Sequence, residues 1–175
     1  MNKILFTPRF IFVSSAVLLA GLSRLMPHPP NFTPIAAMAL FCGANCTNKY
    51  TAFIIPILAM LLSDFIIGFH NTLIPVYISL CFIVLIGFGL VGKTNKVSSL
   101  FVASVSSSIL FFVITNLAVW YYGVLYPKNF IGLTECYLMA IPFFKNTILG
   151  DIFFSSILFG SFYFAQVKFP RLVKV

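Results

Sequence analysis

Long apolar runs, separated by short polar or proline-containing segments, make up most of the 175-residue chain. A helix of about 20 apolar residues crosses the hydrocarbon core of a bilayer, and helices satisfy their own backbone polar groups there. The pattern therefore predicts an all-α integral membrane protein, a bundle of about six transmembrane helices in one domain over residues 1–175. The expected spans are Phe10–Leu25, Thr33–Cys46, Thr51–Ile67, Leu73–Val91, Ser98–Leu125 and Asn146–Gln166.

Two connections between these runs have a distinct character. Pro27-His28-Pro29-Pro30-Asn31 cannot continue a helix, because proline lacks the backbone N–H and clashes with the preceding turn, so a stiff extended turn is expected there. The longest connection runs from Tyr126 to Lys145. It is expected to hold a short interfacial helix over Leu133–Phe144 that ends near Pro142.

The composition favours a membrane protein over a soluble domain. Hydrophobic residues make up 61% of the chain and charged residues 8%, with a mean hydropathy of +1.07, whereas soluble domains carry about 25% charged residues. The net charge of +8 does not indicate a nucleic-acid-binding surface, because the basic residues stand singly at the ends of apolar runs. The cysteines have no C-x-x-C spacing and indicate no metal site; they are Cys42, Cys46, Cys81 and Cys136.

The distribution of Lys and Arg predicts how the chain is oriented in the membrane. With six spans, eight of the eleven basic residues fall on one side, and short cytoplasmic loops are enriched in Lys and Arg. Both termini are therefore expected in the cytoplasm, with the first run kept as an uncleaved span. The eight residues are Lys3, Arg9, Lys49, Lys93, Lys96, Lys168, Arg171 and Lys174, and the other side holds Arg24, Lys128 and Lys145.

Two of the three acidic residues, Asp64 and Asp151, lie inside apolar runs. A charged group at membrane depth costs about 2.5 kcal/mol or more, so it normally faces the protein interior or a watery cavity. The orientation above places both aspartates in the outer half of the membrane, with other polar residues at the same level. We therefore expect an outer polar cavity that binds a small solute, with the proline-histidine turn as part of a gate. The candidate residues are Arg24, His28, Asn31, Asp64, His70, Asn116, Trp120, Glu135 and Asp151.

Each candidate also has a structural alternative. The two aspartates would be ion-pair partners of Arg24 and Lys145, because buried charges pair where they can. Asn116 would hydrogen-bond a neighbouring helix, and Trp120, Tyr121 and Tyr122 would form an interfacial aromatic belt. His28 and His70 would be ordinary turn residues.

Four parts of the chain carry a family resemblance: Arg24–Ala37, Ser63–His70, Thr115–Trp120 and parts of Gly132–Asp151. They resemble an uncharacterised bacterial family of small membrane proteins regarded as transport proteins. That family is in turn similar to the substrate-binding (S) components of energy-coupling-factor transporters. The resemblance implies a six-helix S-component-like fold in the bacterial inner membrane. It also implies capture of a vitamin-like molecule, metabolite or ion from outside, and docking on a transmembrane coupling subunit with two ATPases.

The S-component resemblance also implies a partner-binding site on the first span. Ala16 and Ala20 stand four residues apart, a spacing that lets two helices approach closely, and such residues face the coupling subunit in S components. No G-x-x-x-x-G-K-[S/T] sequence occurs, so an ATP-driven cycle requires other subunits. We therefore expect a non-enzymatic capture subunit without cofactors, whose partners are the bilayer, a solute and a coupling module.

Three other functions stay open at this point. A proton-coupled carrier would work alone if Asp64 or Asp151 took up a proton together with the solute. An intramembrane aspartyl protease would use the two carboxylates to activate water, although Ile148 replaces the first glycine of the G-x-G-D signature. An accessory membrane subunit without a ligand would have fully paired acidic residues and no outer cavity.

Overall fold

The computed structural model describes residues 7–69 and 71–173, and the regular structure over those residues is entirely helical. The expectation of an all-α fold is therefore confirmed. Three of the helices, α3, α5 and α6, are long and apolar enough to cross a membrane, while α1, α2 and α4 are apolar but shorter. The elements are α1 (Pro8–Ser23), α2 (Ile35–Asn45), α3 (Lys49–Ile67), α4 (Leu73–Phe88), α5 (Val97–Tyr122), α6 (Phe130–Lys168) and the 3₁₀ turn η1 (Pro170–Leu172).

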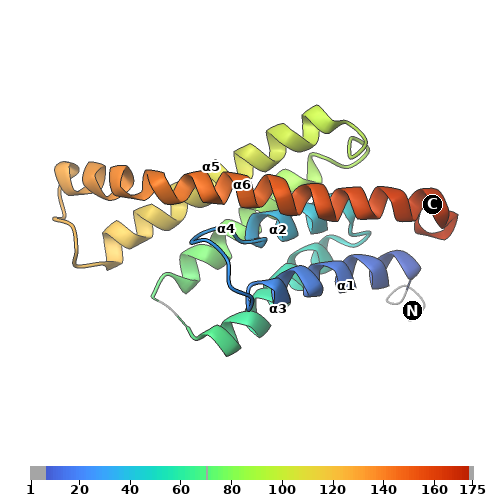
Figure 1. Ribbon diagram of the computed structural model, residues 1–175, viewed down its shortest axis with the longest axis horizontal. Helices are drawn as coiled ribbons and strands as arrows, with labels where there is room; N and C mark the ends of the chain where they lie inside the picture. Colours follow the sequence, from blue (N-terminus) through green and yellow to red (C-terminus); the bar gives the residue numbers. More distant parts are fainter. Residues whose placement is uncertain (1–6, 70, 174–175) are drawn as a thin grey trace.

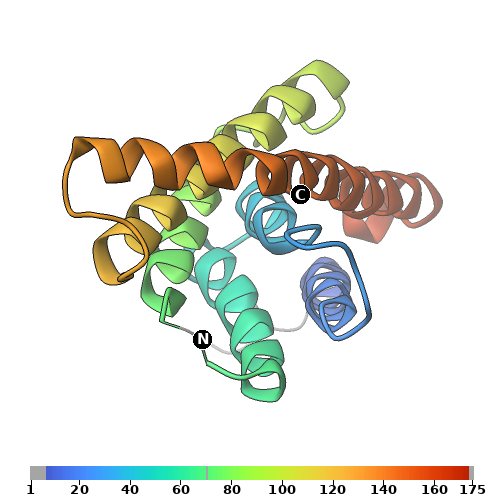
Figure 2. The same cartoon turned by 60° about the vertical axis from the view of Figure 1, so that its left-hand side comes forward.

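Helix α2 lies at the centre of the bundle, and all 11 of its residues are buried. It contacts each of the other five helices, and the two ribbon views show it enclosed by them (Figures 1 and 2). A helix that is apolar all round is stable only when it is buried, and α2 has no charged residue. The Phe41 ring lies edge-on to the rings of Phe159 and Phe162, with centroids 5.1 and 5.6 Å apart.

Two glycines let α2 and α4 cross in close contact. A Cβ atom added to Gly87 would lie 2.6 Å from the Leu40 carbonyl oxygen and 2.8 Å from the Cα atom of Gly43. Both separations are far inside normal van der Waals contact. Small residues at such crossings allow two helix backbones to approach, so this pair fixes the position of α2 against α4.

Gly87→Ala is expected to destabilise the protein, because the added methyl group forces α2 and α4 apart in a close-packed core. Overpacking of this kind typically costs about 1–3 kcal/mol. Gly160→Ala is the matched control, since it lies in α6 and a Cβ atom there would meet no atom within 4 Å. Unfolding of the two variants in detergent gives the comparison, and equal stability of both would contradict the predicted effect.

Helix α6 differs most from the sequence-based expectation. The predicted end near Pro142 and the separate short helix over Leu133–Phe144 are wrong, because α6 is helical throughout its 39 residues. In apolar helices a proline is tolerated where neighbouring helices support the chain. Here Tyr137 Oη donates to the Val113 carbonyl of α5 at 2.6 Å, and aromatic contacts with α5 continue beyond the proline.

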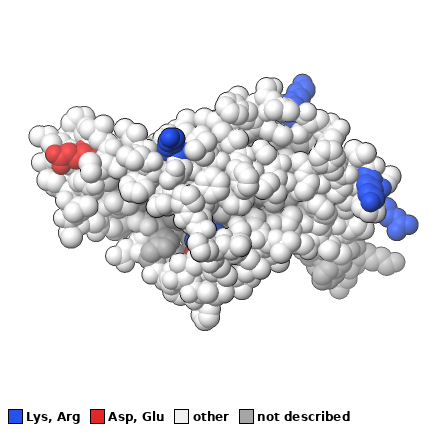
Figure 3. Space-filling model, in the orientation of Figure 1, with Lys and Arg blue, Asp and Glu red and all other residues white. Residues whose placement is uncertain are grey.

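The length of α6 carries it beyond the rest of the bundle. At about 1.5 Å per residue, 39 residues extend well past a hydrocarbon core of about 30 Å. Its first turns pair with the end of α5 in a hairpin that projects at the end opposite the chain termini (Figure 1). Glu135 lies in this hairpin, and the exposed acidic atoms in Figure 3 are at the same end.

The helices alternate in direction, so α1 begins where α6 ends (Figure 1). The α2–α3 turn, which precedes Lys49, and the α4–α5 turn, with Lys93 and Lys96, lie at this end as well. Lys3 and Lys174 fall outside the described residues. Arg9, Lys49, Lys93 and Lys96 therefore lie at one end of the bundle and Lys128 lies in the hairpin turn at the other, whereas Lys145 lies inside α6 and not at the end of a helix as expected.

Arg9 joins three chain segments at the end of the bundle where the termini lie. Its Nε atom donates to the Asn45 carbonyl at 2.8 Å, and Nη1 donates to the Leu172 carbonyl at 3.0 Å. The guanidinium also lies 5.0 Å from the centre of the Phe162 ring. A buried cation near the C-terminus of a helix is favourable, so Arg9 ties the start of α1 to the end of α2 and to η1.

Candidate functional site

The segment of residues 24–34 connects α1 to α2 on the side away from the termini (Figures 1 and 2). It is non-helical, as its prolines predict, and its residues 25–31 are exposed. Asn31 adopts a φ of 62°, a left-handed conformation that asparagine tolerates. Only the two ends of the segment are covered by the bundle, and each end meets one of the two buried aspartates.

A buried ion pair holds the start of the segment. Arg24 Nη1 donates to Asp64 Oδ1 at 2.7 Å and also to the Ser63 hydroxyl, and the Arg24 and Asp64 side chains are 9% and 1% exposed. Tyr77 Oη donates to the second carboxylate oxygen, Asp64 Oδ2, at 2.9 Å. The ion pair between Arg24 and Asp64 is thus confirmed, and it joins the end of α1 to α3 and α4.

Asp151 of α6 holds the other end of the segment. Ser108 Oγ donates to Asp151 Oδ2 at 2.6 Å, and the backbone N–H groups of Ala36 and Ala37 donate to the same carboxylate. These N–H groups open α2, where the N-cap residue Pro34 makes no side-chain cap. The first N–H groups of a helix lack partners within it, and the helix dipole favours a negative charge there. Asp151 therefore caps α2 from another helix.

The end of the segment is also packed directly on α6. Asn146 Nδ2 donates to the Pro30 carbonyl at 3.0 Å, and the ring of Phe32 lies 5.6 and 5.7 Å from the rings of Phe153 and Phe154. Gly150 allows this approach, because a Cβ atom there would lie 3.1 Å from the Phe32 Cα atom. The segment is therefore fixed to α3 and α4 at its start and to α6 at its end.

The partners of Asp151 differ from the sequence-based alternative. Among the described residues its carboxylate accepts hydrogen bonds from Ser108 and from α2, and it forms no ion pair with Lys145. No hydrogen bond joins Asp151 to Asp64 in the described part of the chain. The two carboxylates thus form separate anchors with separate partners.

Three further candidates belong to the α5–α6 hairpin rather than to either anchor. Among the described residues the Asn116 amide donates within its own helix, from Nδ2 to the Phe112 carbonyl at 2.8 Å, and not to a neighbouring helix. Trp120 Nε1 donates to the Pro127 carbonyl in the hairpin turn at 2.9 Å. Glu135 is exposed on the first turns of α6. The hydrogen bonds of Asn116 and Trp120 therefore stay within the hairpin and do not involve the two anchors.

The last three candidates lie in turns. His28 and Asn31 are exposed on the 24–34 segment, and His28 Nδ1 lies 3.0 Å from the Pro29 carbonyl oxygen. His70 lies outside the described residues. Of the nine candidates, Arg24, Asp64 and Asp151 form the two anchors, while His28 and Asn31 lie on the segment that the anchors hold.

Sequence reasoning missed Tyr77 and Ser108, which donate to the two aspartates. Tyr77 could have been identified from the sequence, because it lies near the outer start of the fourth apolar run. Asp64 lies near the outer end of the third run, at the same level of the membrane. Ser108 is one of several serines in the fifth run and had none. The backbone donors of α2 leave no trace in the sequence at all.

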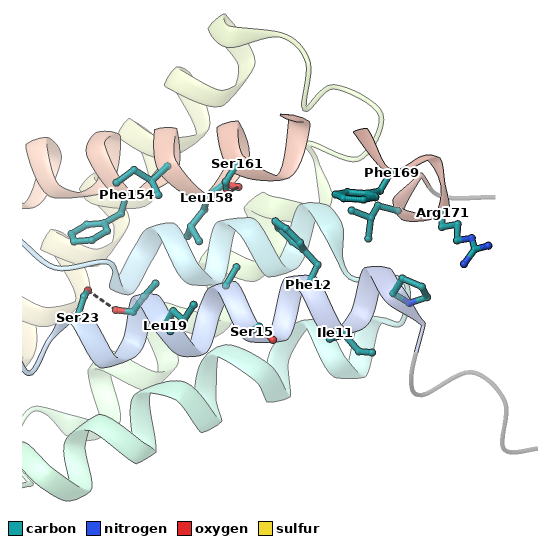
Figure 4. A pocket seen from close by; sticks show the side chains of 15 residues that line it. Ile11, Phe12, Ser15, Leu19, Ser23, Phe154, Leu158, Ser161, Phe169 and Arg171 are labelled. Carbon is teal, nitrogen blue, oxygen red and sulfur yellow. Dashed lines mark hydrogen bonds between the residues drawn. The ribbon is translucent and has the colours of Figure 1, made fainter. Parts of the chain in front are cut away.

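A groove between α1 and α6 is a second candidate site. It has a volume of about 900 Å³ and apolar walls, with Ser15, Ser23 and Ser161 at its edges (Figure 4). Ala16 and Ala20, predicted to bind a partner, both line it. Two other pockets, of about 500 and 320 Å³, lie along α5 and α6. Neither aspartate lines any of these three pockets, so none of them is the expected outer polar cavity.

Comparison with known proteins gives one match. No curated protein and no solved structure matches the chain, so the S-component resemblance gains no named relative. A family model described as a family of unknown function (DUF6580) matches residues 5–172. This match covers nearly the whole chain, and the protein therefore belongs to the DUF6580 family.

Proposed function

We propose that the protein is a membrane-embedded capture subunit that takes a small solute from the extracytoplasmic side and passes it to a larger transporter. The observation that carries this proposal is that buried carboxylates hold both ends of one exposed, proline-stiffened segment. Burying a carboxylate is costly even when it is paired, and a connection between two helices needs no such anchors. The arrangement indicates that the position of the segment is important for function, as it would be for a gate over a solute path.

In this proposal all six helices lie in the bacterial inner membrane with both termini in the cytoplasm. The basic residues support this orientation, since Arg9, Lys49, Lys93 and Lys96 lie at the end of the bundle where the termini are found. Short cytoplasmic connections are enriched in Lys and Arg. The 24–34 segment then faces outwards, where it meets an arriving solute.

The candidate residues have two different roles in this proposal, positioning the gate and binding the solute. The carboxylates of Asp64 and Asp151 already accept hydrogen bonds from the protein, so we assign them to positioning the gate rather than to binding the solute. The exposed polar side chains of the gate are His28 and Asn31. They are the proposed solute contacts, together with whichever of His70, Asn116, Trp120 and Glu135 face the same path.

The groove between α1 and α6 supports docking on a coupling subunit. Gly21 of α1 packs inwards, where an added Cβ atom would lie 3.2 Å from the Cβ atom of Ala59. Ala16 and Ala20 instead line the open groove. Small residues on a membrane helix permit close approach of a second helix, so the outward pair is the proposed contact with a transmembrane partner.

Native mass spectrometry of the protein released from nanodiscs tests solute capture. We expect a small-molecule adduct on the wild-type protein and its loss in the double variant His28→Ala, Asn31→Gly. Glycine suits the positive φ at residue 31, and neither change touches an anchor. Lys49→Ala, at the other end of the bundle, is the control and should keep the adduct. A wild-type protein without any adduct, or a double variant that retains it, would contradict the proposal.

Uptake into vesicles separates a capture subunit from a carrier that works alone. The proposal predicts solute uptake only when a coupling subunit and ATPases are reconstituted with the protein. Uptake by the protein alone, driven by a pH gradient, would favour the carrier. The structure gives no support to a protease dyad, since no hydrogen bond joins the two aspartates among the described residues.

An accessory subunit without a ligand is the second candidate function. The observation that favours it is that Asp64 and Asp151 are both fully engaged by protein groups. It predicts that the protein co-purifies with a membrane partner but carries no adduct. The mass-spectrometric comparison above distinguishes it from solute capture.

A further inference from the structure

The guanidinium of Arg24 uses only part of its hydrogen-bonding capacity. An arginine guanidinium carries N–H donors on all of its nitrogens. In Arg24, Nη1 donates to Asp64 Oδ1 and to the Ser63 hydroxyl, while Nε and Nη2 have no hydrogen-bond partner among the described residues. The side chain is only 9% exposed. A largely buried donor without an acceptor is unfavourable, so these free N–H groups point to an acceptor that comes from outside the protein.

Tyr77 accounts for the free edge of this guanidinium. A paired arginine frequently meets both oxygens of a carboxylate with two of its nitrogens. Here Tyr77 Oη donates to the second carboxylate oxygen, Asp64 Oδ2, at 2.9 Å. Asp64 therefore holds Arg24 through Nη1 alone, and the Nε and Nη2 groups, which share one edge of the planar fork, are left for a further acceptor.

Arg9, near the other end of α1, is the fully bonded counterpart. Its Nε and Nη1 atoms donate to the carbonyls of Asn45 and Leu172, and Nη2 donates to Asn45 Oδ1 at 3.5 Å. All three guanidinium nitrogens of Arg9 thus have a protein acceptor. Burial of an arginine in this bundle does not by itself leave nitrogens without partners, so the free edge of Arg24 is a specific feature of the outer end of α1.

The free edge of Arg24 is accessible from outside the protein. Among the described residues, neither Nε nor Nη2 belongs to the unpaired side-chain atoms that the protein covers completely. Arg24 also opens the 24–34 segment, whose residues 25–31 are exposed. A solute that meets this segment therefore also meets the free N–H groups of Arg24.

The geometry points to a solute that carries a carboxylate, which Arg24 holds side-on through Nε and Nη2. Two parallel N–H groups on one edge of a guanidinium match the two oxygens of a carboxylate, whereas an amide offers only one oxygen. The guanidinium then lies between the carboxylates of the solute and of Asp64, which limits their repulsion. This inference rests on the proposed function, because it names the class of solute that the capture subunit takes up.

Heteronuclear NMR of protein with isotope-labelled arginine tests the site, with acetate as the probe. The chain has three arginines, Arg9, Arg24 and Arg171, so substitution assigns their Nε–H signals. Native mass spectrometry first confirms that washing has removed any adduct. Exchange of chloride for acetate at constant ionic strength should shift the Arg24 signal to saturation and leave the Arg9 signal in place. Acetamide has the same shape but lacks one charge-assisted hydrogen bond, so it should bind at least about tenfold more weakly.

Arg24→Lys is the matched variant for the native solute. Lysine keeps the positive charge beside Asp64 but has no second nitrogen for a side-on contact. The adduct that the wild-type protein carries should therefore fall about tenfold or more, at a melting temperature close to that of the wild type. Arg171→Lys makes the same change in η1, at the other end of the bundle, and should keep the adduct.

An Arg24 signal that does not move in acetate, or that responds equally to acetate and acetamide, would overturn the carboxylate assignment. If the wild-type protein carries an adduct in that case, solute capture stands and only the class of solute is wrong. An Arg24 signal that responds to acetate in a protein that never carries an adduct would support the carboxylate site and reject the capture function.

Discussion

Asp64→Leu is expected to lower the free energy of unfolding by about 3–5 kcal/mol, because it leaves a buried charge without its partner. The guanidinium of Arg24 is 9% exposed and has Asp64 as its carboxylate partner at 2.7 Å. Without Asp64 this cation must either stay buried unpaired or pull the end of α1 out of the bundle. SDS titration of the purified protein, followed by circular dichroism, measures the loss.

The double variant Arg24→Met, Asp64→Leu separates the cost of an unpaired charge from the worth of the pair. Replacing a whole buried ion pair by apolar residues is often neutral or stabilising, so the double variant should recover most of the loss. Tyr77→Phe removes one neutral donor to the same carboxylate and should cost only about 0.5–1.5 kcal/mol. Additive losses in the double variant would contradict a direct pair.

Asp151→Leu is expected to cost about 3 kcal/mol or more, because each buried donor left without an acceptor costs about 1–3 kcal/mol. Two donors, the N–H groups of Ala36 and Ala37, lose their acceptor in this variant, whereas Ser108 Oγ keeps the Ser104 carbonyl of its own helix at 3.1 Å. These N–H groups lie in the first turn of the central helix α2, so the loss of their acceptor destabilises the core of the bundle. Asp151→Asn keeps a neutral acceptor oxygen and should lose less.

Ser155→Ala is the matched control for Asp151→Leu. It lies one turn further along α6, and its hydroxyl group has no hydrogen-bond partner. In detergent its removal should leave the melting temperature unchanged or raise it, because a buried hydroxyl group without a partner is unfavourable. If Asp151→Leu were no more harmful than Ser155→Ala in the same melting experiment, Asp151 would not act as the cap of α2.

The fold was largely predictable because apolar runs and their interruptions report helices directly. The six runs correspond to the six helices, and the absence of a polar face on α2 agrees with its complete burial. Pro142 was misread because its effect depends on neighbours. Tyr137 and the aromatic contacts with α5 support α6 across the proline, and nothing local in the sequence shows that support.

The site was predictable in part, because a carboxylate in an apolar run is costly and needs a partner wherever it lies. That argument located Asp64 and Asp151 and suggested Arg24 as a partner. It gave the wrong partner for Asp151, since the carboxylate meets backbone N–H groups of α2, and every residue type except proline carries such groups. The shared role of the two aspartates, one at each end of the 24–34 segment, appears only in three dimensions.

Hydrogen exchange along the chain, measured in nanodiscs, tests most directly whether the two aspartates hold the two ends of the 24–34 segment. Asp64→Asn should speed exchange at residues 24–26 and leave Ala36 and Ala37 protected, whereas Asp151→Asn should expose Ala36 and Ala37 and leave residues 24–26 as in the wild type. Unchanged exchange over residues 24–37 in both variants would contradict the account.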